Sequence, residues 1–179
     1  MISYARLTAA AALLATSALA TAQSPPPPIP AEAKMQAVPY LENAGMSDVF
    51  EITSSEIALT KSQNPMIRTY ATELIGHHTM TTNTALAAAK KGGVMPPPPV
   101  LNAQFRALVS ELNNAPAADF DRIYIAQQIP SHQGALDLQT GYAANGDNAS
   151  LKAAARASVP IVRQHLDEAN KLQARMARR

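Results

Sequence analysis

The sequence predicts an all-α protein, an antiparallel bundle of four long helices with an additional short helix between the second and the third. Alanine, leucine, methionine, glutamate and glutamine recur from residue 31 onward, and aromatic residues make up only 4% of the chain. Apolar residues recur at spacings of three and four, and short turn signals separate the long stretches. At 179 residues the chain has the length of a single domain.

Residues 1–22 have the pattern of a secretory signal. Arg6 supplies a positive charge, and the apolar run LTAAAALLATSALA is too short to span a bilayer well. Small residues at 20–22 suit cleavage before Gln23, whereas an uncleaved anchor is the alternative. We therefore expect a periplasmic or secreted protein, with association to the outer membrane left open. The chain has no cysteine, so a metal site must use His, Asp or Glu.

The charge of the chain argues against a nucleic-acid partner. It has 15 basic and 13 acidic residues and a formal net charge of +2, which gives no strong attraction to nucleic acid. The C-terminal basic residues suit the end of a helix, and contact with a membrane surface or an envelope protein is the alternative. These residues are Lys171, Arg175, Arg178 and Arg179. No transmembrane segment is expected after signal cleavage.

The first two helices follow a proline-rich linker. Residues 23–38 include SPPPPIP, which suits neither a helix interior nor a central strand, so the domain is expected to cover 39–179. The first helix is predicted from about Pro39 to Gln63. Asn64 and Pro65 then end it and begin a second helix, because asparagine caps helices and proline suits the first helical position. Gly92 and Gly93 are expected to end this second helix near Lys91.

The second half of the chain begins with a stiff connector, VMPPPPV at 94–100, which suits a crossing between the ends of a bundle. A short helix at about 101–112 and a third long helix at about 116–144 are expected next. Asn145 to Asp147 predicts a left-handed cap and then an N-cap, and the fourth long helix extends to about Met176. Pro130 and Pro160 are expected to bend their helices or, alternatively, to break them.

Three of the four histidines lie on the apolar faces of different predicted helices, and an acid lies on the fourth. The helical neighbours that define these faces are Leu74 for His78, Ile129 and Leu136 for His132, and Ile161 and Val162 for His165. Glu51 lies on the apolar face of the first helix, between Asp48 and Ser55. Each long helix therefore directs one potential metal ligand inward.

These four residues are expected at similar heights in the bundle. Glu51, His78 and His132 lie 13 or 14 residues from the turns at 64 and 146, and His165 lies 19 residues from the second turn. Three imidazoles and a carboxylate suit one divalent transition metal such as Zn, Fe, Mn or Cu. The alternative is a buried hydrogen-bonded network without metal, in which Glu51 pairs with a protonated histidine.

His77 is a weaker ligand candidate, because it is rotated about 100° around the helix from its neighbour His78. Glu73 beside His77, and Asp137 near His132, are candidates for acids that orient a histidine ring. Solvent-facing charge is the alternative for both acids.

Motifs along most of the chain resemble the domain-of-unknown-function 4142 family, which consists of ferritin-like exported bacterial proteins often labelled outer-membrane proteins. The motifs are YLENAGMSDVFEI with Glu51, NPMIRTYATELIGHH with His78, FDRIYI with Asp121 and Tyr124, SHQGAL with His132, and VPIVRQHLDEA with Pro160 and His165. The resemblance implies a ferritin-like bundle in which Glu51, His78, His132 and His165 are the motif-matched polar positions. It implies no known activity.

The sequence departs from the family pattern at His77 and Ser131, where the family usually or often has an acid. It also lacks the paired Glu-x-x-His motifs of di-iron bundles, which disfavours di-iron oxidase or iron-storage chemistry. The leading hypothesis is a periplasmic protein that binds one metal ion in its core. The alternatives are a non-catalytic envelope interaction or stress protein with a structural His/Glu network, and an enzyme with an open metal position.

Overall fold

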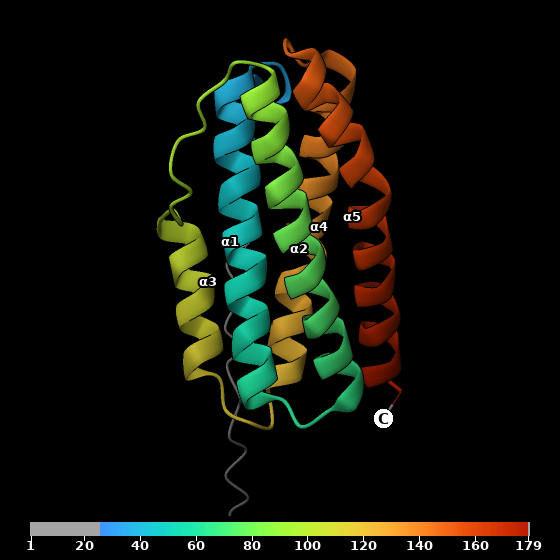
Figure 1. Ribbon diagram of the computed structural model, residues 1–179. Coiled ribbons are helices and arrows are strands. Elements are labelled where there is room, and N and C mark those ends of the chain that lie inside the picture. Colours follow the sequence, from blue (N-terminus) through green and yellow to red (C-terminus); the bar gives the residue numbers. More distant parts are fainter. Residues whose placement is uncertain (1–25, 179) are drawn as a thin grey trace, which may run out of the picture.

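The computed structural model describes residues 26–178, and within this range the secondary structure consists of five α-helices and one short 3₁₀ helix (Figure 1). The all-α prediction is confirmed, including the short helix between the second and third long helices. The predicted signal peptide lies outside the described residues. The elements are η1 (Ala31–Lys34), α1 (Ala37–Lys61), α2 (Pro65–Lys91), α3 (Ala103–Asn114), α4 (Phe120–Asn145) and α5 (Ala149–Met176).

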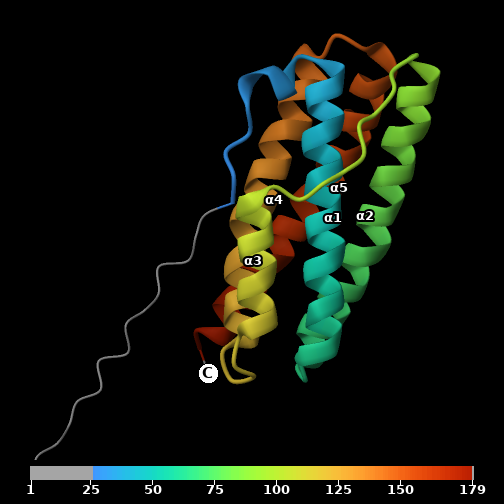
Figure 2. The same ribbon diagram turned by 90° about the vertical axis from the view of Figure 1, so that its left-hand side faces the viewer.

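The four long helices lie side by side around a shared core (Figures 1 and 2). α1 contacts α2 and α4, and α5 also contacts α2 and α4, so each long helix touches two others. The short helix α3 lies outside this group, against α1 and α4. This arrangement gives every long helix one face that points to the common interior.

The turn between α1 and α2 forms as its sequence predicts. Asn64 is the N-cap of α2, its side chain accepts a hydrogen bond from the backbone N–H of Met66 at 3.1 Å, and Pro65 occupies the first turn. α1 begins at Ala37, two residues before the expected start, and ends at Lys61. The Lys61 ammonium donates hydrogen bonds to three backbone carbonyls at the end of α3, and these bonds join α1 to α3. The carbonyls are those of Leu112, Asn113 and Ala115.

Part of the expected proline-rich linker packs on the helices. Residues 31–34 form η1, Ala33 is fully buried, and Ile29 packs against the core cluster around Tyr40 and Tyr142. The backbone N–H of Asp147 donates to the carbonyl of Met35 at 2.9 Å, which joins this segment to the α4–α5 turn. The segment from Ile29 onward is therefore part of the packed structure.

The connector after α2 runs down the outside of α1 to the start of α3 (Figure 1). It passes close to Gly45, where an added Cβ would lie 3.2 Å from the Cβ of Pro99. A glycine on α1 thus lets the proline-rich chain approach the helix backbone. α3 and α4 begin at 103 and 120, slightly later than the sequence predicts.

The turn between α4 and α5 corrects one prediction. Gly146 has φ −59°, and no residue from Asn145 to Asp147 adopts a left-handed conformation. The N-cap of α5 is Asn148, whose side chain accepts from the backbone N–H groups of Ser150 and Leu151 at 3.1 and 3.2 Å. The expected cap at Asp147 is wrong because its side chain instead accepts a hydrogen bond from the Tyr142 hydroxyl.

α4 and α5 continue through Pro130 and Pro160, so the alternative of broken helices is wrong. The core consists of two main apolar clusters near the two ends of the long helices. One contains Leu74, Tyr124, Ile125 and Leu172 among others, and the other contains Tyr40, Leu138, Tyr142 and Leu151 among others. On every long helix the two clusters are separated by a buried polar residue, and these residues form a layer across the interior: Glu51, His78, His132 and His165.

Candidate metal centre

The polar layer brings together three histidines from three different helices. His78 on α2, His132 on α4 and His165 on α5 each offer a ligand nitrogen, and these nitrogens lie within 4.8 Å of one another. Their side chains are closely associated, with ring centroids 5.2 to 5.7 Å apart. All three residues are at most 2% exposed. The inward orientation that helical spacing predicts is thus present in all three helices.

The rings of His78 and His132 are each held by one nitrogen. His78 Nδ1 lies 2.7 Å from Oδ1 of Asp48, and His132 Nδ1 donates to the backbone carbonyl of Gln128 at 2.9 Å. In both rings the other nitrogen, Nε2, is buried and has no hydrogen-bond partner. A proton on Nδ1 leaves the Nε2 lone pair free, which is the tautomer that a metal-binding histidine requires.

His165 is held in the opposite sense, through Nε2, which lies 2.8 Å from Nδ1 of His77. The two rings are stacked, with centroids 5.1 Å apart and planes inclined at 15°. Nδ1 of His165 is buried without a hydrogen-bond partner. His77, the weaker ligand candidate, therefore contacts a member of the polar layer but lies outside it, and it is half-buried.

Asp48 is the functional residue that sequence reasoning missed. It also accepts hydrogen bonds from the hydroxyl of Thr82 at 2.6 Å and from that of Thr81 at 3.3 Å. These bonds fix its carboxylate against His78. The signal was available, since Asp48 lies one helical turn before Glu51 on the same face of α1.

The acids expected to orient histidines have other positions. Asp137 pairs with Lys34 at 2.5 Å and is exposed, so it is a surface charge and does not orient His132. The described hydrogen bond of His77 goes to His165 and not to Glu73, which instead lines a surface groove. Both carboxylates lie on exposed faces of their helices.

Glu51 completes the polar layer from α1. Its side chain is 1% exposed, neither carboxylate oxygen has a hydrogen-bond partner, and Oε1 lies 3.8 Å from Nδ1 of His132. Burial raises the pKa of Glu51 to about 8, although the charge of His78 opposes this shift. A buried carboxylate without partners is costly, so this residue calls for a proton or a cation.

The histidines divide into two groups by their pKa. Burial, assisted by the neighbouring histidines, lowers the pKa of His132 to about 3 and that of His165 to about 2. Burial also acts to lower the pKa of His78, but the hydrogen bond and charge of Asp48 outweigh it and raise this pKa. At neutral pH His132 and His165 are therefore uncharged and present free lone pairs.

The three histidines fit a transition-metal ion in chemistry and nearly fit in distance. Glu51 does not belong to this group of mutually close ligand atoms, and its Oε1 lies nearest the Nδ1 side of His132. Imidazole nitrogens bind such an ion at about 2.0–2.1 Å, so two ligands of a tetrahedral site lie about 3.3 Å apart. Nitrogens within 4.8 Å of one another need to approach by at most about 1.5 Å, which side-chain rotation can supply. Three imidazoles and one carboxylate are all ligands that Zn, Fe, Mn or Cu accept.

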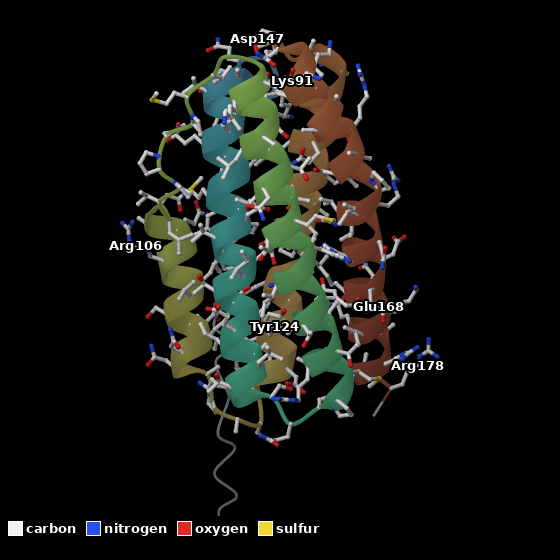
Figure 3. The ribbon with its side chains drawn as sticks, in the orientation of Figure 1. Lys91, Arg106, Tyr124, Asp147, Glu168 and Arg178 are labelled. Carbon is white, nitrogen blue, oxygen red and sulfur yellow. The ribbon has the colours of Figure 1, made fainter. Side chains whose placement is uncertain are left out.

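Hydroxyl groups border the polar layer on the side of the apolar cluster that contains Tyr124 and Leu172. The Tyr124 hydroxyl, labelled in Figure 3, lies 2.9 Å from the hydroxyl of Ser55. The Tyr70 hydroxyl donates to the backbone carbonyl of His165 at 3.2 Å, and the Gln128 amide donates to the hydroxyl of Ser54 at 3.1 Å. These bonds hold α1, α2, α4 and α5 in register at the level of the histidines.

No described helix combines the length and the apolar character that crossing a membrane requires.

Two solved structures share the fold at low sequence identity. The crystal structure of a DUF305 fragment from Deinococcus radiodurans is 18% identical with a TM-score of 0.67, over 84% of this chain and 99% of that chain. A structure described as CopM in the Cu(II)-bound form is 16% identical with a TM-score of 0.66, over 79% of this chain and 97% of that chain. At these identities the likeness concerns the fold alone.

A search of curated proteins gave no match. The sequence pattern of the family described as "Domain of unknown function (DUF4142)" matches residues 22–172, which is most of the chain. The matched range contains Asp48, Glu51 and all four histidines. The protein therefore belongs to the DUF4142 family.

Proposed function

We propose that the protein binds one divalent transition-metal ion between its four long helices. The ligands are Nε2 of His78, Nε2 of His132, Nδ1 of His165 and the carboxylate of Glu51. The observation that carries this proposal is that the three nitrogens and both carboxylate oxygens are buried in one layer and lack hydrogen-bond partners. Buried polar atoms normally have a partner, and an ion would supply one to every member of the set.

The proposal also concerns the fold around this site and the location of the protein. The four long helices form a ferritin-like antiparallel bundle, and a signal peptide at residues 1–22 directs the chain to the periplasm or out of the cell. The Cu(II)-bound form of CopM, which shares the fold, supports copper as one candidate beside Zn, Fe and Mn.

A structural network without metal is the competing function, in which the protein is a non-catalytic envelope component. It accounts for the bond of His78 to Asp48 and that of His132 to Gln128. It leaves three imidazole nitrogens and the Glu51 carboxylate unpaired, at a cost of about 1–3 kcal/mol for each buried unsatisfied group. The metal proposal removes this cost and is therefore preferred.

The test is metal analysis and calorimetric titration of the untagged protein with Zn, Cu, Mn and Fe. We expect one equivalent to bind and to raise the melting temperature, and His132→Gln to abolish both effects. Ser131→Ala is the matched control, because the buried Ser131 hydroxyl neighbours His132 and has no hydrogen-bond partner. An unchanged melting temperature with all four metals would reject the proposal.

A further inference from the structure

We propose that the metal ion reaches the site between α2 and α5, and that His77 binds the ion first and passes it to His165. This inference rests on the proposed function and adds a route to it. The four proposed ligand residues are each at most 2% exposed, so an ion cannot reach them directly from solvent. A residue that contacts both solvent and the layer is therefore needed.

His77 has both contacts. It is half-buried, and its Nδ1 lies 2.8 Å from Nε2 of His165. His78 and His132 are instead held by Asp48 and by the Gln128 carbonyl, so His165 is the member of the layer that is joined to a further histidine. Two imidazole nitrogens at this separation are close to the spacing of two ligands on one ion, about 3 Å.

A groove on the molecular surface reaches His165, the inner member of this pair, although His77 is not among the residues that line it. It has a volume of about 740 Å³, lies between α2 and α5, and reaches Tyr70 and His165. Glu73 lines the groove and lies one helical turn before His77 on the same face of α2. Glu168, labelled on α5 in Figure 3, also lines it. These carboxylates place negative charge beside the His77–His165 pair, where a cation would arrive.

The charge of the groove as a whole is mixed, because Arg163, Lys171 and Arg175 also line it. Lys171 lies 3.4 Å from a Glu168 oxygen, and Arg175 donates to the sulfur of Met66. The exposed Glu73 has no such basic neighbour among the described ion pairs. We therefore assign the attraction to Glu73 rather than to the groove in general.

The opposite side of the layer offers less room. The cavity beside His78, which Asp48 and Gln139 also line, has a volume of about 10 Å³. One water molecule needs at least ~10–15 Å³ of such space. Passage on that side would require the helices to separate, whereas the α2–α5 side requires a rearrangement of His77 and His165.

The experiment measures the rate of Co²⁺ loading into the metal-free, full-length protein by stopped-flow absorbance, together with the Co²⁺ dissociation rate. His77→Gln keeps a side-chain oxygen that can accept from Nε2 of His165 but removes the imidazole. We expect loading and dissociation both to slow by at least fivefold while one equivalent still binds. Thr79→Gln is the control, because Thr79 is exposed and rotated about 200° from His77 around α2, and it should load like the wild type.

Three other outcomes would be informative. Loading of His77→Gln at the wild-type rate overturns the route, and so does faster dissociation alone, since it would mean that His77 only orients His165. Failure of the wild type to bind Co²⁺, Zn²⁺, Cu²⁺, Mn²⁺ or Fe²⁺ rejects the proposed function itself. Either of the first two results, obtained with one bound equivalent, leaves the proposed function standing.

A second pair of variants covers the case in which His77→Gln does not fold. Glu73→Gln and Glu42→Gln each remove one exposed carboxylate, beside the groove and on α1 respectively. We expect Glu73→Gln to load at least twofold more slowly than Glu42→Gln at low ionic strength, and the difference to shrink in high salt. Equal loading rates of the two variants at low ionic strength would overturn the route.

Discussion

Asp48 on α1 lies 2.7 Å from Nδ1 of His78 on α2, and this contact fixes which nitrogen of His78 faces the interior. The hydroxyls of Thr81 and Thr82 hold the Asp48 carboxylate from the α2 side. A carboxylate that accepts the outer N–H of a metal-binding histidine orients its ring and increases its basicity. Asp48 is thus a positioning residue for the proposed site.

We predict that Asp48→Asn weakens metal binding without changing its stoichiometry. The amide cannot supply the negative charge that favours the Nδ1–H tautomer of His78, and loss of such a partner typically costs about 10–100-fold in metal affinity. Competition titrations against a chelator of known affinity measure this change. Asp137→Asn is the control, since Asp137 pairs with Lys34 on the surface and should leave the affinity unchanged. Equal affinities of Asp48→Asn and the wild type would contradict the role of Asp48.

We predict that Glu51→Gln stabilises the metal-free protein and removes the stabilisation by metal. The pKa of Glu51 is about 8 in the folded protein and near 4.5 when unfolded, so the unfolded state loses its proton first as pH rises. Wild-type stability is therefore lost progressively between about pH 4.5 and 8, and the glutamine variant avoids this loss. Urea unfolding of both proteins across this range, with chelator present, should show a difference that grows with pH. A difference independent of pH would argue against a buried, unpaired Glu51.

Helical periodicity was sufficient to predict the residues of the polar layer. Glu51, His78, His132 and His165 share faces with apolar residues, and burial of those faces forces the polar side chains into the interior. From the sequence, His165 was expected about one helical turn away from the height of the other three residues, because the turn before the fourth long helix was predicted at residue 146. The true start of α5 at Ala149 reduces that offset.

The partners of these residues were not predictable in the same way. Whether His78 bonds to Asp48, or His165 to His77, depends on the rotation of each helix about its axis and on side-chain rotamers, which spacing along one helix does not determine. Glu73 is nearer in sequence to His77 than His165, which contacts it, and His132 is held by the Gln128 carbonyl on the preceding turn and not by Asp137 on the following one. The cap at Asn148 was missed for a similar reason, since Asp147 is a good cap but is engaged by Tyr142.

We predict that His165→Leu abolishes metal binding and makes the metal-free protein less sensitive to acid. The pKa of His165 is lowered to about 2 by burial, so the unfolded state gains a proton below about pH 6.5 while the folded state does not. The stability that depends on the neutral ring is present above pH 6.5 and is lost as pH falls toward the folded pKa. Thermal melts of both proteins between pH 7 and 4 should therefore converge or cross, with the variant favoured at low pH. Metal binding by the variant with wild-type affinity would remove His165 from the ligand set.

The last prediction concerns the turn that sets the height of His165. Asn148 caps α5 by accepting from Ser150 and Leu151, and its amide also donates to the carbonyl of Gly92 at 3.0 Å, which links the end of α2 to the start of α5. Asn64 makes the corresponding cap of α2 with a single bond to Met66.

We expect Asn64→Ala to cost about 1 kcal/mol of unfolding free energy, which is typical of a lost N-cap. Asn148→Ala should cost about 2 kcal/mol, because the Gly92 carbonyl loses its partner as well. Asn148→Asp keeps the cap and loses only the donor, so its unfolding free energy in urea should lie between those of the wild type and Asn148→Ala. Equal values for Asn148→Asp and the wild type would show that the link to Gly92 contributes nothing.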